Sequence, residues 1–217
     1  MVPSSLKSTR AKTIGSYVAR RRIAANMINS DFLLKAYCSG FFPMADDKSG
    51  EIGWYSPDPR GVFDLKDFRV ARSLKLTMKR KPFEIAIDRR FEEVMRCCAS
   101  RKETWISEEI IQSYGELHRL GYAHSVECWR GDELVGGLYG VAIKGAFFGE
   151  SMFSRVRDAS KVALVILVER LNERGYQLLD TQYVTPHLAR FGAREIPRDN
   201  YLHQLQKALT KDCSFNH

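Results

Sequence analysis

The sequence contains no uninterrupted hydrophobic run close to the roughly 20 residues that a membrane-spanning helix needs. The longest candidate, residues 162–168, is only one flank of a predicted helix. Paired cysteine spacing is also absent, which argues against a zinc site and against a disulfide framework. The five cysteines are Cys38, Cys97, Cys98, Cys128 and Cys213. These absences predict a cytoplasmic protein without a metal centre and without membrane contact.

Acidic residues are missing from the first 30 positions, which contain six basic residues. The whole chain has 34 Lys and Arg and 26 Asp and Glu, so the remainder carries 34 − 6 = 28 basic and 26 acidic residues. Most of the net charge of +8 therefore lies in residues 1–30, which we interpret as a disordered basic extension. An organellar transit peptide has a similar composition and stays an alternative.

Polar side chains follow two apolar runs on either side of one predicted helix. Glu150 follows a predicted strand at 145–148, and Asp180 and Gln182 follow the next strand. Residues 158–174 between them have the spacing of an amphipathic helix. Such a strand-helix-strand unit makes the two strands parallel in nearly all cases. We therefore expect the three side chains at one carboxyl edge of the sheet, where open α/β sheets place ligands.

Two carboxylates and a carboxamide at one edge can bind an amine, steer a proton and hold a carbonyl group. This set predicts acyl transfer without a Cys or His nucleophile. An acyl-CoA donor would need a glycine-rich loop before the crossover helix, because backbone N–H groups bind the pyrophosphate there. Residues 154–159 contain no glycine, which disfavours an acyl-CoA N-acetyltransferase but leaves it as an alternative.

Three predicted strands joined by tight turns precede the crossover helix, at 126–129, 134–143 and 146–148. They form an antiparallel meander. The pattern predicts an α+β fold with an acetyltransferase-like (GNAT-type) mixed sheet and a crossover helix. Further helices are predicted at 31–39, 70–79 and 91–99 and from Ser107 to Gly121, and a further strand is predicted at 83–87.

The chain divides into three predicted parts. After the extension at 1–30, residues 31–70 would form a small N-terminal α/β lobe, and residues 71–217 an acyltransferase-like catalytic domain. Turn-forming residues are frequent at 41–61, so we predict a loop there with one short strand at 52–55.

Four basic residues gather in one stretch and are candidates for binding RNA phosphates, because such binding needs several cations in one place. They are Lys75, Lys79, Arg80 and Lys81. A solvated helix face explains the same residues equally well.

Motifs in a fixed order carry a resemblance to one known family. They are residues 41–45, 54–57, 104–106, 136–140, 149–155, 159–161, 180–182, 185–188 and 192–198. Together they resemble the leucyl/phenylalanyl-tRNA–protein transferases from about residue 31 to residue 208, leaving residues 1–30 outside.

The resemblance implies transfer of leucine or phenylalanine, and by extension methionine, from its tRNA to a protein. The acceptor would be the α-amino group of an N-terminal Arg or Lys, and the product an N-degron for protein degradation. The partners would be Leu-tRNA, Phe-tRNA and proteins or peptides with such N-termini. No cofactor is expected, because the donor ester is already activated. A non-catalytic tRNA-binding module stays a second alternative.

The resemblance also implies roles for single residues. Gln182 would orient the attacking amine, Asp180 would polarise that network, and Glu150 would engage the cationic acceptor or receive its proton. Asp180 could equally cap a turn. Donor-pocket positions would be Leu138, Phe147, Leu164, Leu167 and Leu171, although ordinary core packing explains the helical leucines too. Gly149 is a further candidate for substrate binding. Trp54 and Trp105 would contact the 3′-terminal adenosine, where stacking is worth about 1–3 kcal/mol.

Overall fold

A computed structural model describes residues 27–46, 49–101 and 104–216 of the chain. The helices are α1 (Ser30–Cys38), α2 (Arg72–Lys79), α3 (Phe91–Ala99), α4 (Glu108–Arg119), α5 (Ala159–Glu173), α6 (Pro186–Ala189) and α7 (Arg198–Leu209). The strands are β1 (Phe42–Ala45), β2 (Ile52–Tyr55), β3 (Arg60–Phe63), β4 (Glu84–Ile87), β5 (Ala123–Arg130), β6 (Glu133–Ile143), β7 (Ala146–Ser154), β8 (Leu178–Gln182) and β9 (Arg194–Ile196). The predicted extension lies outside the described residues up to residue 26.

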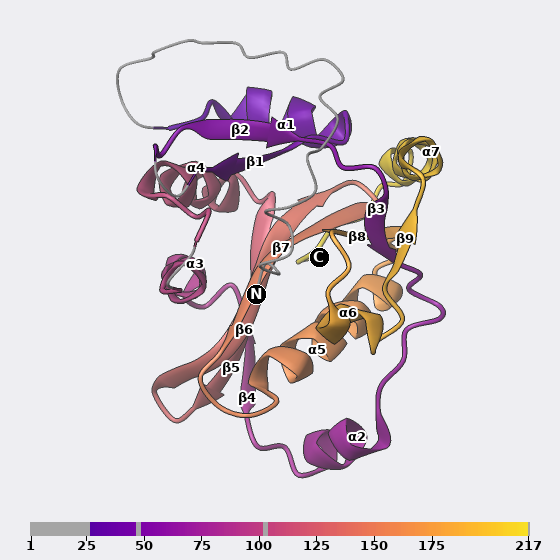
Figure 1. Ribbon diagram of the computed structural model, residues 1–217. Coiled ribbons are helices and arrows are strands. Elements are labelled where there is room, and N and C mark those ends of the chain that lie inside the picture. The colour runs from indigo at the N-terminus through magenta and orange to yellow at the C-terminus, as the bar shows by residue number, and fades with distance from the viewer. Residues whose placement is uncertain (1–26, 47–48, 102–103, 217) are drawn as a thin grey trace.

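The centre of the fold is a seven-stranded mixed sheet with the order β4-β5-β6-β7-β8-β3-β9, while β1 and β2 form a separate hairpin (Figure 1). Strands β4 to β7 pair antiparallel in succession, as expected for a meander. Strand β8 pairs parallel with β7 after the crossover helix α5. The predicted α+β class and the mixed sheet are therefore confirmed.

Strand β7 is longer than its sequence pattern indicated. The predicted strand ended at Phe148, whereas β7 continues to Ser154, because β6 supplies backbone partners as far as Gly136. Glu150 therefore lies within the strand and not after it. Only the first part of β7 pairs with β8, ending at Phe148 opposite Asp180, so Glu150 still projects beyond the parallel pairing.

Helices cover the two faces of the sheet, and each face has its own apolar core. Figure 1 shows α5 on one side and α3 and α4 on the other. Successive residues of one strand enter different cores, so Phe147 packs with α5 whereas Phe148 packs with α1, α3 and α4. Helix α5 is also more deeply embedded than an amphipathic surface helix, since α2 packs against its outer side through Leu74 and Met78.

The N-terminal part contains two strands that the sequence pattern did not indicate. The stretch 41–61 was predicted as a loop with one strand, but β1 pairs with β2 and β3 enters the large sheet. Both strands have only four residues, and β3 finds its partners in β8 and β9, more than 100 positions along the chain. Turn-forming residues at Pro57 and Pro59 dominate the local signal, so the pairing is decided at long range.

Candidate active site

The end of β8 carries Gln182 in an unusual backbone conformation. Its φ is +58°, which is rare for a residue with a side chain, and the N–H of Tyr183 donates to the carbonyl of Thr181 across it at 2.6 Å. This three-residue turn belongs to the strained γ type. Glycine is needed at position 61 beside it, because an added Cβ would lie 2.7 Å from the carbonyl carbon of Tyr183.

Asp180 is buried and fully paired with Arg60. The guanidinium donates from Nε to Oδ1 at 3.0 Å and from Nη2 to Oδ2 at 2.6 Å, and both side chains have no solvent exposure. Tyr201 donates to the same carboxylate at 2.7 Å, and Oδ1 accepts the backbone N–H of Gln182 at 2.8 Å. Arg60 also lies over the rings of Phe42 and Tyr201. The carboxylate therefore holds the strained turn in place.

Glu150 is the second carboxylate, and its direct partners are neutral. Tyr37 donates to Oε1 at 2.7 Å, Tyr114 approaches Oε2 at 3.5 Å, and the Gln182 amide Nε2 donates to Oε1 at 3.3 Å. Tyr37 and Tyr114 also hydrogen-bond each other. Although part of the side chain reaches solvent, burial raises the pKa of Glu150 to about 8, and the hydrogen bond from Tyr37 only partly opposes this. Glu150 is thus a group that can take up or release a proton near neutral pH.

The geometry brings Glu150, Asp180 and Gln182 together at one edge of the sheet. Gln182 links the two carboxylates, through its backbone N–H to Asp180 and through its side chain to Glu150. Among the described residues, no donor reaches the carbonyl oxygen of the Gln182 side chain, which can therefore accept an N–H group. The site therefore combines Asp180, whose charge Arg60 compensates, Glu150, which can exchange a proton, and the oriented amide of Gln182.

Sequence reasoning missed four residues of this network: Arg60, Tyr37, Tyr114 and Tyr201. Arg60 lies 120 positions before its partner Asp180, inside the turn-rich stretch 41–61 that was predicted as a loop with one short strand. The tyrosines occupy positions that look like ordinary core positions of α1, α4 and α7. The only local signal was the Arg60-Gly61 pair next to a short apolar run.

The residues expected to line a donor pocket lie mostly on the other face of the sheet. Leu138, Phe147, Leu164, Leu167 and Leu171 are at most 3% exposed and belong to the core against α5. The structure brings these five together but separates them from Glu150 by the thickness of the sheet. Gly149 is partly buried in β7 between the two groups, and a Cβ there would lie 3.5 Å from the backbone oxygen of Asp180.

Trp54 lies in the β1-β2 hairpin, and Trp105 lies beside it. Trp54 pairs with Pro43 in the hairpin, and its ring meets Phe32 of α1 edge-on at 5.1 Å. The backbone oxygen of Trp105 accepts the N–H of Ala45 at 3.1 Å. Both rings are partly buried against the core that carries Glu150. The hairpin therefore places the two tryptophans on the same side of the sheet as the polar cluster.

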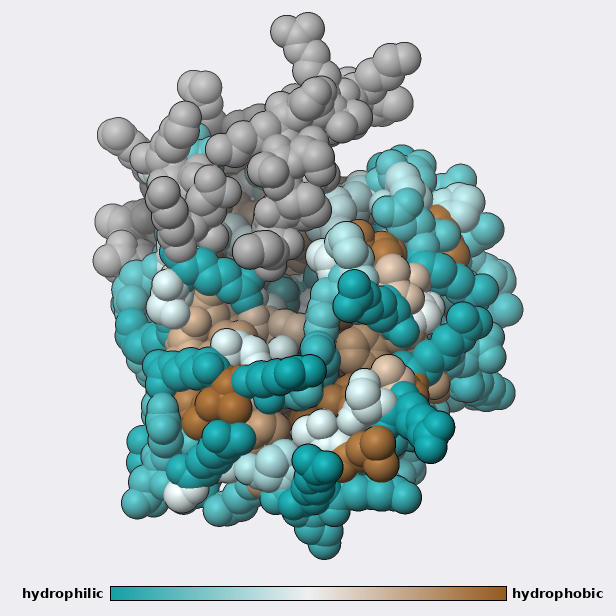
Figure 2. Space-filling model, turned by 60° about the horizontal axis from the view of Figure 1, so that its bottom comes forward, coloured by the Kyte–Doolittle hydropathy of each residue, from teal (hydrophilic) through white to brown (hydrophobic). Residues whose placement is uncertain are grey.

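The basic residues lie on and just after α2, away from the polar cluster. Lys75, Lys79, Arg80 and Lys81 are all exposed, while α2 packs on α5 and so on the face opposite Glu150. Figure 2 turns the end of the molecule with α2 toward the viewer and shows hydrophilic side chains interleaved with hydrophobic patches. A cavity of about 290 Å³ opens beside Lys81, lined by apolar residues of α2, α5 and β4.

Another cavity, of about 370 Å³, lies near the C-terminus, and neither cavity is lined by Glu150, Asp180 or Gln182. Within residues 27–46, 49–101 and 104–216, no three His, Cys, Asp or Glu side chains are grouped as metal ligands would be. In the same part of the chain, every helix is too short or too polar to cross a membrane.

Comparisons with known proteins agree with the motif pattern. The model of the leucyl/phenylalanyl-tRNA protein transferase family matches residues 62–206, and that of its N-terminal domain matches residues 26–58. A transferase of this name from Herpetosiphon aurantiacus is 54% identical over 87% of this chain and 98% of its own length. The one from Gloeobacter violaceus is 53% identical over 87% of this chain and 97% of its own length. The chain therefore belongs to the leucyl/phenylalanyl-tRNA protein transferase family.

Proposed function

We propose that this protein transfers leucine or phenylalanine from aminoacyl-tRNA to the α-amino group of a protein that begins with Arg or Lys. Family membership supports the reaction class, and the cluster of Glu150, Asp180 and Gln182 supports the chemistry. The amine nitrogen attacks the carbonyl carbon of the ester and forms the peptide bond. The bond to the ribose oxygen breaks, and the amine proton ends on that oxygen.

Gln182 orients the attacking amine through its side-chain oxygen, because its Nε2 already donates to Glu150. Asp180 acts through the backbone of Gln182 and not as a base, since Arg60 and Tyr201 occupy its oxygens. Correct placement of two reactants alone supplies a large part of a rate enhancement, because it replaces the entropy of a bimolecular encounter. The strained turn is therefore part of the catalytic arrangement.

Glu150 engages the acceptor. Its pKa of about 8 means that the carboxyl is mostly protonated at neutral pH in the free protein. A bound Arg or Lys side chain, or the protonated α-amine, lowers this pKa by Coulombic attraction. Binding of a cationic acceptor thus generates the carboxylate that receives a proton or holds the charge. A neutral N-terminal residue supplies less of this attraction.

The donor is held by three separate groups of residues in this proposal. The amino-acid side chain enters the core formed by Leu138, Phe147, Leu164, Leu167 and Leu171 beside Gly149. Trp54 and Trp105 stack on the terminal adenosine, and the α2 cations contact phosphates further along the tRNA. A GNAT-type sheet, a lobe at residues 31–70 and a catalytic domain at 71–217 complete the proposal, although β3 joins the large sheet from within the lobe.

Radiolabelled Leu-tRNA and a panel of peptides that differ only at residue 1 test this function. Arg- and Lys-initiated peptides should become labelled, whereas Ala-, Asp- and N-acetyl-Arg peptides should not, because the site offers a carboxyl group and the attack needs a free amine. Equal labelling of Asp and Arg peptides would defeat the acceptor assignment. Tight binding of deacylated tRNA without any transfer would favour an RNA-binding module instead.

A further inference from the structure

The chain after α7 crosses back over the sheet and is held at several points. Asp212 pairs with Lys144 at 3.0 Å, the Phe215 carbonyl accepts from Arg170 Nε at 2.8 Å, and Asn216 donates to Asp88 at 3.0 Å. The family model ends at residue 206, so this tail lies beyond the matched region. We call residues 211–216 the C-terminal tail.

Phe215 is the buried anchor of the tail, with 3% exposure in a segment that is neither helix nor strand. Its ring stacks on His124 with the centroids 4.4 Å apart and on Phe147 at 5.4 Å. The guanidinium of Arg170 lies over the same ring at 4.9 Å. His124 is itself fixed, because its ring nitrogens contact Asp88 and the Gly121 carbonyl. Phe215 thus closes the α5-side core next to Phe147.

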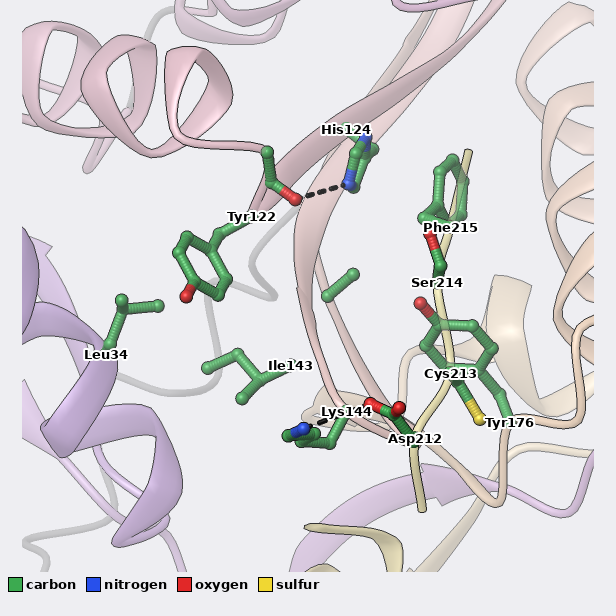
Figure 3. A pocket seen from close by; sticks show the side chains of 12 residues that line it. Leu34, Tyr122, His124, Ile143, Lys144, Tyr176, Asp212, Cys213, Ser214 and Phe215 are labelled. Carbon is green, nitrogen blue, oxygen red and sulfur yellow. Dashed lines mark hydrogen bonds and ion pairs between the residues drawn. The ribbon is translucent and has the colours of Figure 1, made fainter. Parts of the chain in front are cut away.

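The cavity of about 370 Å³ lies on another side of Phe215. Figure 3 shows Phe215 and His124 along one wall, Tyr122 and Leu34 on the opposite side, and Lys144 and Asp212 nearby. Cavities of about 150 Å³ already accommodate benzene, so this space is large enough for an aromatic ring to move into. Phe215 therefore separates a closed core from free volume.

Phe147 connects the tail to the donor side chain. The five residues proposed to receive leucine or phenylalanine are at most 3% exposed, so the core has no open slot in the described arrangement. A donor side chain can enter only if one of these residues moves, since protein cores are close-packed. The ring of Phe147 is backed by Phe215, and the cavity lies beyond Phe215.

We propose that Phe215 determines donor specificity as the floor of the amino-acid pocket, limiting how far Phe147 can move when the donor side chain enters. The inference rests on the proposed function. A smaller residue at position 215 lets Phe147 withdraw further, which deepens the pocket and favours the longer phenylalanine over leucine. Methylene-sized changes of a pocket alter such preferences by about 10- to 200-fold at most.

The test measures kcat/KM for Leu-tRNA and Phe-tRNA with one Arg-initiated peptide, using the full chain and its F215L and F215A variants. The ratio of kcat/KM for Phe-tRNA to kcat/KM for Leu-tRNA should rise as the side chain at position 215 becomes smaller. It should rise by at least about fivefold in F215A. Phe83→Leu is the matched control, because Phe83 is buried in the same core but does not stack on Phe147. Its ratio should stay unchanged.

A ratio is independent of the amount of folded enzyme, so a loss of stability alone does not imitate the expected result. Equal loss for both donors in F215A, or a ratio unchanged within twofold, would overturn the specificity role and leave Phe215 as a packing residue. Absence of transfer by the unaltered protein with either donor would instead refute the proposed function, which keeps the two failures apart.

Discussion

Strands β7 and β8 present two different environments on their two faces. On one face Glu150, Asp180 and Gln182 are held by Tyr37, Tyr114, Tyr201 and Arg60. On the other face, Phe147 and Leu179 pack against α5 without a polar partner. Neighbouring residues of one strand thus serve separate tasks, since a pleated strand points successive side chains to opposite faces. A single parallel pair therefore carries a polar cluster on one face and an apolar core on the other.

The polar face is itself divided, because its two carboxylates are stabilised differently. Asp180 is paired with a buried cation, whereas Glu150 is surrounded by hydroxyl groups and an amide. Both carboxylates are withdrawn from water, at least in part, but only Asp180 has a direct partner with a compensating charge. Variants that change one face or one carboxylate at a time show whether these differences are as large as the geometry implies.

The largest effect is expected for Arg60→Met, which leaves Asp180 buried without its cation. The free energy of unfolding in urea should fall by about 3–5 kcal/mol, the usual loss when one partner of a buried pair is removed. Adding Asp180→Leu should recover most of that stability but not the activity. Arg194→Met removes a partly exposed pair with Asp64 and should cost less than about 1 kcal/mol. A small loss in Arg60→Met would mean that water replaces the guanidinium.

Gln182→Ala should lower the transfer rate at least about 10²-fold, or about 2.7 kcal/mol, because the amine loses its orienting group. Leu-tRNA and Phe-tRNA should be affected equally, since Gln182 does not touch the apolar face. Binding of Leu-tRNA should persist. Gln177→Ala, which removes an exposed carboxamide, is the control and should leave the rate unchanged. If the transfer rate of Gln182→Ala stays within a few-fold of that of the unaltered protein, this edge of the sheet is not the active site.

The pH dependence of stability tests the environment of Glu150. Its pKa is raised from 4.5 to about 8, so the folded state binds more protons than the unfolded state between these values. This contribution to stability is complete below about pH 4.5 and is lost as the pH rises toward 8. The slope can reach about 1.4 kcal/mol per pH unit. Glu150→Gln should flatten it in urea titrations, and an unchanged slope would show that Glu150 is solvated.

The smallest effect is expected for the basic residues on the α5 side. Neutralising Lys79, Arg80 and Lys81 together should leave transfer from a minimal aminoacyl-adenosine unchanged. The salt dependence of tRNA binding should become shallower by about 0.7–0.9 in its log–log slope for each lost phosphate contact. Neutralising the exposed Lys207 and Lys211 is the comparison. Equal slopes in both variants would show that the α2 cations form a solvated helix end and do not contact the tRNA phosphates.

Local patterns were sufficient for several elements. Helix α4 follows the predicted N-cap Ser107, whose hydroxyl accepts the N–H of Ile110, and the crossover unit containing α5 has the predicted order and direction. The meander and the α+β class follow from spacing and turn residues. The convergence of Glu150 and Gln182 also followed, because β7 and β8 run parallel and both residues lie just beyond the paired part of these strands.

The sequence by itself determined these periodic elements and the family motifs, since both depend on residues that are close along the chain. Only the tertiary structure decided that Arg60 compensates Asp180, that β3 enters the large sheet and that Glu150 lies inside β7. It also decided which face of the sheet each candidate side chain occupies. These features depend on contacts between segments up to 120 positions apart, and their energies come from burial and pairing that no local pattern contains.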